Sequence, residues 1–168
     1  MTAQTNPIKR ANRSARAAGA VGKAPLCYRA FREVVSPGNE ASVLDFGAGP
    51  SAAHTKSLRE DGYDVTAYDF GDNITDDIDP DALSRSYEIV IASNVLNVQE
   101  EELLPATLHQ LYESVKPAGC LIWNYPASPR YTELSSRQML HQVMSLGFVS
   151  YRLLSGTRNA PVYLCWKV

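Results

Sequence analysis

The sequence is poor in the residues on which cross-linked and metal-binding proteins depend. Of its 168 residues, only three are cysteines, Cys27, Cys120 and Cys165, and only three are histidines. The cysteines lie far apart without a C-x-x-C pair, so we expect neither a disulfide framework nor a zinc site. Cys120 and Cys165 sit in apolar runs, where a free cysteine is usually a small buried hydrophobic residue. No metal site is therefore expected.

Long hydrophobic runs are also missing. No apolar stretch approaches the roughly 20 residues that cross a membrane, and no apolar segment follows the basic N-terminus as in a secretory signal. With 45% apolar and 20% charged residues, the composition is typical of a globular chain with one hydrophobic core. We expect a cytoplasmic protein without a membrane partner.

Charge is distributed unevenly along the chain. Residues 1–33 carry seven basic side chains and one acidic one, a net charge of +6, whereas the remainder carries nine and seventeen, a net charge of −8. Residues 1–25 have almost no large apolar side chain, which predicts a flexible or partly helical arm before a folded domain at 26–168. The basic residues at 9–32 fit a nucleic-acid partner, because contacts to phosphates supply most non-specific affinity. A solvated tail without a ligand fits the composition equally well.

The clearest functional signal is the stretch VLDFGAGP at residues 43–50. A short apolar run ends there in a turn, and Gly47 and Gly49 let its backbone approach a ligand without interference from a Cβ atom. A helix is expected over 51–61, and the next apolar run ends in Asp69. In a β-α-β unit Asp69 then lies beside the glycine turn, where its carboxylate can accept both hydroxyls of a ribose.

Two kinds of cofactor compete for this turn. With Ala52 in the place of the third glycine, the spacing meets the tolerant form of the dinucleotide fingerprint. Asp45 stands directly before the turn, where a carboxylate repels a pyrophosphate but suits a ligand with an ammonium and a sulfonium group. Asp45 therefore favours S-adenosylmethionine over a nicotinamide cofactor.

The remaining segments predict a mostly parallel sheet between helices, a Rossmann-like three-layer α/β sandwich. Residues 71–86 are polar and acidic where a doubly wound sheet has its third strand, so we expect that unit to be trimmed to a rudimentary strand at Asn73 and Ile74. The last two strands are expected to form an antiparallel hairpin. Further helices are expected at 26–35, 104–115 and 135–146, and further strands at 87–92, 120–123, 148–154 and 161–168.

This order of parts resembles the class I S-adenosylmethionine-dependent methyltransferases over about residues 26–168. Residues 43–49 are similar to the family's first motif, Asp69 to its ribose-binding acid, residues 93–96 to the segment after its fourth strand, and residues 116–119 to its L-K-P-G-G turn. Residues 46–50, 93–98 and 124–130 also resemble short methyltransferases encoded by bacteriophages. The resemblance implies methyl transfer from S-adenosylmethionine and a sheet of seven strands.

The resemblance also implies which residues bind the cofactor. The glycine turn would surround the amino-acid end of the cofactor, and Asp69 would hold the ribose. Asp77 and Ile78 would flank the adenine, and Asn94 would lie under the methionine portion. The implied cofactor-binding residues are Asp45, Gly47, Ala48, Gly49, Asp69, Phe70, Asp77, Ile78, Asn94 and Val95.

No catalytic residue stands out. Methyl transfer from a sulfonium is an in-line displacement that needs alignment in a dry pocket, and it needs a base only if the acceptor must lose a proton. The candidates are Asn94, Asn97 and Tyr125, followed by Tyr131 and His54. Asn94 and Asn97 fit caps of the following helix equally well, and His54 fits a partly exposed helical residue better than a base.

The methyl acceptor stays open at this level. Residues 93–96 read Ser-Asn-Val-Leu, whereas nucleobase amino-methyltransferases usually carry (Asp/Asn/Ser)-Pro-Pro-(Tyr/Phe) at that place. These residues therefore argue against an enzyme that methylates nucleobase amines. The basic arm, in contrast, favours a polyanionic acceptor, so nucleic acid is slightly favoured over a small metabolite. Two other functions remain: an enzyme that cleaves S-adenosylmethionine as an anti-restriction device, and a non-catalytic domain that binds it. The oligomeric state is not indicated.

Overall fold

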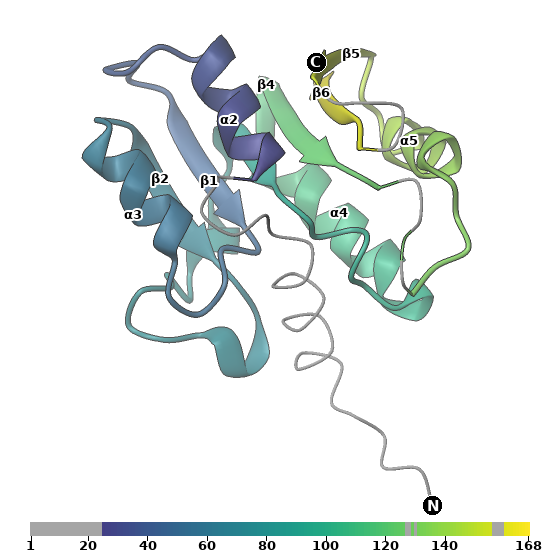
Figure 1. The fold of residues 1–168 in the computed structure, drawn as a ribbon, viewed down its shortest axis with the longest axis horizontal. Coiled ribbons are helices and arrows are strands. Elements are labelled where there is room, and N and C mark those ends of the chain that lie inside the picture. Colours follow the sequence, from purple (N-terminus) through teal and green to yellow (C-terminus); the bar gives the residue numbers. More distant parts are fainter. Residues whose placement is uncertain (1–24, 127–128, 130, 156–159) are drawn as a thin grey trace, which may run out of the picture.

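The computed structural model describes residues 25–126, 129, 131–155 and 160–168. In this part of the chain six strands form one sheet in the order β2-β1-β3-β4-β6-β5 (Figure 1). The strands are β1 Ser42–Phe46, β2 Asp64–Tyr68, β3 Tyr87–Ala92, β4 Val115–Asn124, β5 Ser150–Ser155 and β6 Val162–Trp166. The helices are α2 Leu26–Val34, α3 Ala53–Glu60, α4 Leu104–Ser114 and α5 Ser136–Ser145, with 3-10 turns η1 Gly71–Asn73, η2 Ala82–Ser84 and η3 Glu101–Leu103.

The sheet is parallel except at its C-terminal hairpin. Strand β1 pairs in parallel with β2 on one side and with β3 on the other, and β3 pairs in parallel with β4. Strand β6 then runs antiparallel between β4 and β5. The strand order reverses between β1 and β3, and ligands of open α/β sheets bind at the carboxyl ends of such strands. The predicted Rossmann-like sheet with a terminal hairpin is confirmed.

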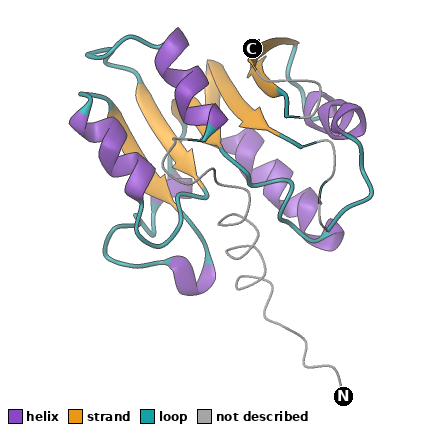
Figure 2. Ribbon diagram, viewed as in Figure 1, coloured by secondary structure: helices purple, strands orange, loops and turns teal. Residues whose placement is uncertain are grey.

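Helices cover both faces of the sheet (Figure 2). Side chains alternate along a strand, so that in β1 the buried Val43 faces one hydrophobic cluster and the buried Leu44 the other. The Val43 cluster includes Phe31 of α2 and Leu58 of α3. The Leu44 cluster includes side chains of α4 and α5, such as Leu111. The molecule is therefore the expected three-layer sandwich.

The unit between β2 and β3 is trimmed, as expected. Among the described residues it contains only η1 and η2, so the sheet has six strands rather than the seven that the family resemblance implied. The expected rudimentary strand at Asn73 and Ile74 is wrong, because Asn73 belongs to η1 and its side chain bonds to Asp69. Aspartate and proline, which are frequent in this segment, are poor strand residues.

Of the boundaries that differ from the expectation, two show a structural cause. Helix α3 begins at Ala53, because Ala52 adopts the left-handed conformation (φ 46°) and extends the glycine turn. Strand β4 begins at Val115 rather than at Cys120, and residues 116–119 form a bulge against β3. Lys116 at this bulge binds Glu88 of β3, with 2.6 Å between Nζ and Oε1. A local pattern cannot reveal such pairing between distant residues.

The expected arm at 1–25 lies outside the described residues except for Pro25, so its flexibility stays a prediction. None of the helices within the described ranges is long and apolar enough to cross a membrane.

Candidate cofactor-binding site

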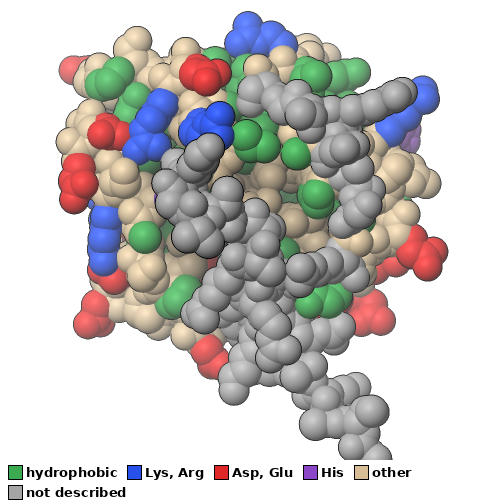
Figure 3. Space-filling model, in the orientation of Figure 1, with side chains coloured by type: hydrophobic (Ala, Val, Ile, Leu, Met, Phe, Trp, Pro, Cys, Tyr) green, Lys and Arg blue, Asp and Glu red, His purple; other side chains and the backbone are tan. Residues whose placement is uncertain are grey.

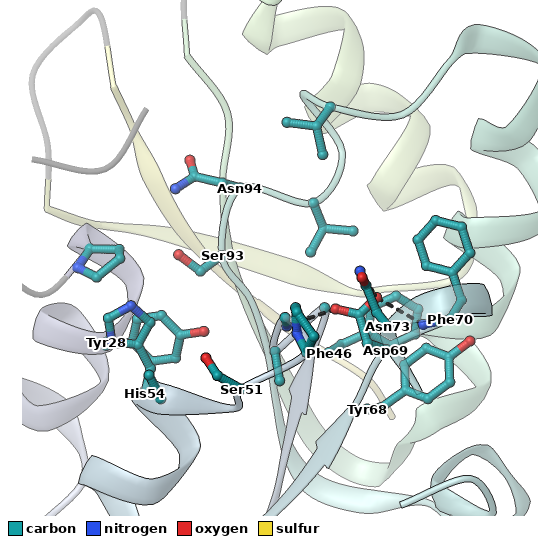
Figure 4. Close-up of a pocket in the computed structure, with 18 of the residues that line it drawn as sticks. Tyr28, Phe46, Ser51, His54, Tyr68, Asp69, Phe70, Asn73, Ser93 and Asn94 are labelled. Carbon is teal, nitrogen blue, oxygen red and sulfur yellow. Dashed lines mark hydrogen bonds between the residues drawn. The ribbon is translucent and has the colours of Figure 1, made fainter. Parts of the chain in front are cut away.

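A pocket of about 360 Å³ opens at the carboxyl ends of β1, β2 and β3. Figure 4 shows that its lining has two ends. Phe70, Tyr68 and Asp69 gather at one end, while Tyr28 and His54 lie at the other. The remaining lining residues are Pro25, Phe46, Gly47, Ala48, Gly49, Pro50, Ser51, Ala53, Asn73, Ser93, Asn94, Val95, Val98 and Gln99.

The glycine turn is tied to the end of β2. The backbone N–H groups of Gly47 and Ala48 both donate to the Tyr68 carbonyl, at 2.8 and 2.9 Å. Gly47 has a φ of +81°, and a Cβ atom added there would lie 2.7 Å from Cγ2 of Val95. Gly49 has a φ of +76°, yet a Cβ atom added there would meet nothing within 4 Å. Gly47 is therefore required by packing, whereas Gly49 faces open space.

Asp69 links the glycine turn to the segment that follows β2. Its Oδ2 accepts the N–H of Gly49 at 2.7 Å, and its Oδ1 accepts the N–H of Phe70 at 2.8 Å and Nδ2 of Asn73 at 3.2 Å. The side chain is buried, with 4% of Asp69 exposed, but it lines the pocket. A carboxylate has about four acceptor positions, so capacity remains for a ribose hydroxyl. The geometry suits the ribose-binding role that the sequence implied.

Asp45 lies behind the turn rather than in the pocket lining. Its Oδ1 accepts the hydroxyl of Tyr28 at 2.8 Å and its Oδ2 accepts that of Thr55 at 2.6 Å. Burial raises the pKa of Asp45 to about 6, although both hydroxyl donors act in the opposite direction. We expected Asp45 to meet the amino-acid end of the cofactor directly, but Asp45 is fully buried and does not line the pocket. Asp45 instead fixes Tyr28, which lines the pocket.

Neither residue expected to flank the adenine lines the pocket. Asp77 pairs with Lys56 on the surface, with 2.8 Å between Oδ2 and Nζ. Ile78 is buried against Ala52 and Ala67 beneath the sheet edge. Because the segment between β2 and β3 is shortened, the sequence did not show which of its residues correspond to the adenine-binding positions of the family. Asn73, from the same segment, lines the pocket in their place.

Only one of the three leading catalytic candidates reaches the pocket. Asn94 lines it, whereas Asn97 is buried outside the lining and Tyr125 is fully buried, its hydroxyl donating to the Leu134 carbonyl at 3.1 Å. The alternative that Asn94 and Asn97 cap the next helix is wrong, because α4 begins at Leu104.

The two further candidates separate as well. His54 is a half-buried residue of α3 that lines the pocket and stacks on Tyr28, with 4.5 Å between ring centroids. Burial lowers the pKa of His54, with a contribution from Arg32, so its imidazole is neutral at pH 7. Tyr131 lies instead in a separate hollow with Glu100 and other acidic residues.

The structure adds lining residues that the sequence reasoning missed. The contact of Tyr28 with Asp45 spans 17 residues of sequence, so no local pattern indicates it. Gln99 lines the pocket with 8% of the residue exposed, and a buried glutamine needs a polar partner. Its place shortly after the strand expected at 87–92 was the one signal available for Gln99.

Comparisons with known proteins identify the family and the fold. Residues 22–158 match the family described as a methyltransferase domain. A TehB-like SAM-dependent methyltransferase from Corynebacterium glutamicum has a similar structure, with a TM-score of 0.68 and 16% identity over 97% of this chain and 100% of that one. A SAM-dependent methyltransferase from Archaeoglobus fulgidus gives a TM-score of 0.63 and 13% identity, covering 84% and 93% of the two chains.

A third similar structure was solved with a product of the cofactor. It is the 1,6-didemethyltoxoflavin-N1-methyltransferase from Burkholderia thailandensis with S-adenosylhomocysteine, with a TM-score of 0.59 and 17% identity over 84% of this chain and 76% of that one. None of the curated proteins compared with the chain matches it. The matches give no support to a cofactor-cleaving or a non-catalytic role, and the resemblance to bacteriophage enzymes stays a prediction. Because the family match spans most of the sequence, the chain belongs to the methyltransferase domain family, as a class I S-adenosylmethionine-dependent methyltransferase.

Proposed function

We propose that this methyltransferase binds S-adenosylmethionine across the pocket and methylates a nucleic acid that its basic arm holds. The observation that carries the cofactor pose is the sharing of one pocket by the glycine turn and Asp69, joined by the bond from Gly49 N to Asp69 Oδ2. The adenosine portion lies at the Asp69 end and the methionine portion at the Tyr28 end.

The two ends of the pocket match the two halves of the cofactor. Beside the Asp69 carboxylate, the rings of Phe70 and Tyr68 offer apolar surface for a base next to its ribose. At the other end, Ser51, Tyr28 and His54 offer polar groups to an amino acid. The neutral imidazole of His54 can donate or accept one hydrogen bond without adding charge.

The chemistry asks little of the protein beyond alignment. When bound, S-adenosylmethionine supplies a methyl group on a sulfonium. An acceptor lone pair held in line with that methyl group would displace the sulfur, which would leave with the electron pair of the C–S bond. The glycine turn and the segment after β3 hold the two sides of the pocket, so their role is to orient the methyl group and to exclude water.

The acceptor assignment depends on where the arm is attached. Pro25 lines the pocket and directly follows the basic segment at 9–24, so this segment is tethered at the site of methyl transfer. Sixteen residues reach at most about 55 Å from that point. Residues 34–168 carry a net charge of −8, and on the face in Figure 3 basic side chains are interspersed with acidic ones. A polyanion would therefore rely on the arm for its phosphate contacts.

A small metabolite is the second candidate. The Burkholderia thailandensis neighbour acts on 1,6-didemethyltoxoflavin, as its name states, and shares the fold. The segment after β3 also lacks the Pro-Pro pair that is usual in enzymes that methylate nucleobase amines. These two observations favour a compact acceptor.

Methyl-labelled S-adenosylmethionine separates the candidates. The protein is incubated with the label and, in separate reactions, with DNA, RNA, protein and a cell metabolite extract. We expect label in a nucleic-acid pool, and less of it when residues 1–22 are deleted. Label confined to the metabolite extract would overturn the nucleic-acid assignment, and the Asp69→Ala variant gives the background.

A further inference from the structure

Beside the pocket, side chains of three elements meet at one amide. Asn124, the last residue of β4, is 7% exposed and does not line the pocket. It contacts Asn94, in the segment after β3, and Cys27 in the first turn of α2. The contacts span 30 residues of sequence in one case and 97 in the other, so only the folded chain assembles them.

The hydrogen bonds fix which atom of each amide lies where. Oδ1 of Asn124 accepts the backbone N–H of Asn94 at 2.7 Å and the Cys27 thiol at 3.2 Å. Burial raises the pKa of Cys27 far above its usual range, so the thiol stays protonated and donates. Two donors converge on this atom, which must therefore be the amide oxygen. The Asn124 Nδ2 then donates to Oδ1 of Asn94, at 2.8 Å.

This pairing holds Asn94 in an uncommon conformation. Asn94 has a φ of +55°, in the left-handed region that residues other than glycine seldom adopt. Its backbone N–H and its side-chain oxygen are both bonded to the same partner amide. Two bonds from one rigid group fix both the backbone and the side-chain orientation, because rotation of either would break one of them.

The result is a defined polar group at the pocket. Asn94 lines the pocket, and its Oδ1 accepts the bond from Asn124. Among the described residues, none accepts a hydrogen bond from the Asn94 Nδ2. We propose that Asn124 is a positioning residue for methyl transfer, which holds Asn94 so that the amide nitrogen is presented to the amino-acid end of the cofactor. This inference rests on the proposed cofactor pose and adds a residue that never touches the ligand.

Asn124→Asp tests the arrangement with little change in size. The aspartate keeps an oxygen for Asn94 N–H and for Cys27, but it sets a second carboxylate oxygen against Oδ1 of Asn94. Binding of S-adenosylhomocysteine and of 5′-methylthioadenosine, which lacks the amino-acid portion, is measured by calorimetry at pH 8. We expect at least a tenfold weaker affinity for S-adenosylhomocysteine and less than a twofold change for 5′-methylthioadenosine.

The Asn94→Gly background separates positioning from general damage. Glycine accepts the left-handed backbone and removes Oδ1, so adding Asn124→Asp should then cost less than twofold. Asn39→Asp, in an exposed turn where Oδ1 accepts the N–H of Ala41, is the matched control and should leave both affinities unchanged. If Asn124→Asp does not fold, Asn124→Ser, which removes the amide group and shortens the side chain without adding a charge, should selectively weaken the binding of S-adenosylhomocysteine.

The outcomes are distinct. Unchanged binding of S-adenosylhomocysteine by the Asn124 variant, an equal loss for both ligands, or a full loss in the Asn94→Gly background would overturn the positioning role. Failure of the wild-type protein to bind S-adenosylhomocysteine would refute the proposed cofactor pose instead.

Discussion

At the scale of single residues, Asp45 shows how a motif residue can act at one remove from the ligand. Its position before the glycine turn follows from the sequence, and its charge was the reason to favour S-adenosylmethionine. Tyr28 and Thr55 occupy its two oxygens. The local motif specified the residue type, but only the packing of α2 and α3 determines what the carboxylate contacts.

The raised pKa of Asp45 predicts a dependence of stability on pH. The folded carboxyl has a pKa of about 6 against 3.8 for the usual group, so between these values the folded state holds a proton that the unfolded state has released. Stability is therefore lost as the pH rises through this window, by on the order of 3 kcal/mol. Urea unfolding of wild type and Asp45→Asn at pH 4.5, 5.5 and 7 should show this loss in the wild type alone; parallel profiles would contradict it.

Gly47 offers a second test at this scale. A Cβ atom at Gly47 meets strain from the positive φ and a 2.7 Å contact with Val95, whereas Gly38 has a similar φ of +77° and nothing within 4 Å. Gly47→Ala should lower the free energy of unfolding by about 1–3 kcal/mol, and by more than Gly38→Ala. It should also weaken binding of S-adenosylhomocysteine. Equal losses at the two glycines would show that the Val95 contact is unimportant.

At the scale of elements, the sequence predicted what depends on local pattern. The apolar run at 87–92 is strand β3, and the alternating run that begins at Asp64 is β2, because each is short and bounded by turn residues. The glycine turn and Asp69 were predicted for the same reason. Residues 116–119, Asn73 and Tyr28 were misplaced or missed, because pairing with distant partners such as Glu88, Asp69 and Asp45 decides their positions.

Helix α5 provides a test of an element that the pattern did predict. The Ser135 hydroxyl accepts the N–H of Gln138, and the Gln138 side chain accepts the N–H of Ser135, which together form a capping box. Ser135→Ala should lower the free energy of unfolding by about 1 kcal/mol. Ser145→Ala, which removes an exposed hydroxyl bonded to its own helix, should cost less. Chemical denaturation measures both free energies of unfolding. Equal losses for the two variants would show that the capping box does not stabilise α5.

At the scale of the whole molecule, the basic sequence before Pro25 meets the described residues at Pro25, which lines the pocket. In the proposed function these two parts have separate tasks, because the pocket residues belong to the described part of the chain, whereas most of the basic surplus lies before Pro25. The order of the segments predicted the sandwich and its hairpin. For the acceptor the sequence offered only the charge of the basic residues at 9–32, because no local motif corresponds to the surfaces that bind it.

Deletion of residues 1–22 tests this separation. It removes Lys9, Arg10, Arg13 and Arg16. Affinity for an RNA or DNA oligonucleotide, followed by fluorescence anisotropy, should fall, and the slope of its logarithm against the logarithm of salt concentration should shrink by about 3. Affinity for S-adenosylhomocysteine should stay within twofold. An unchanged salt slope would show that residues 1–22 are a solvated tail that does not contact the nucleic acid.

The most direct test of the central claim is calorimetric titration of S-adenosylhomocysteine into wild type, Asp69→Ala and Asp76→Ala. Asp69 lines the pocket at the glycine turn, whereas Asp76 is an exposed acid in the neighbouring loop. We predict one binding site in the wild type and in Asp76→Ala, and no measurable binding by a folded Asp69→Ala. Equal affinity of Asp69→Ala and the wild type would contradict the assignment of this pocket to the cofactor.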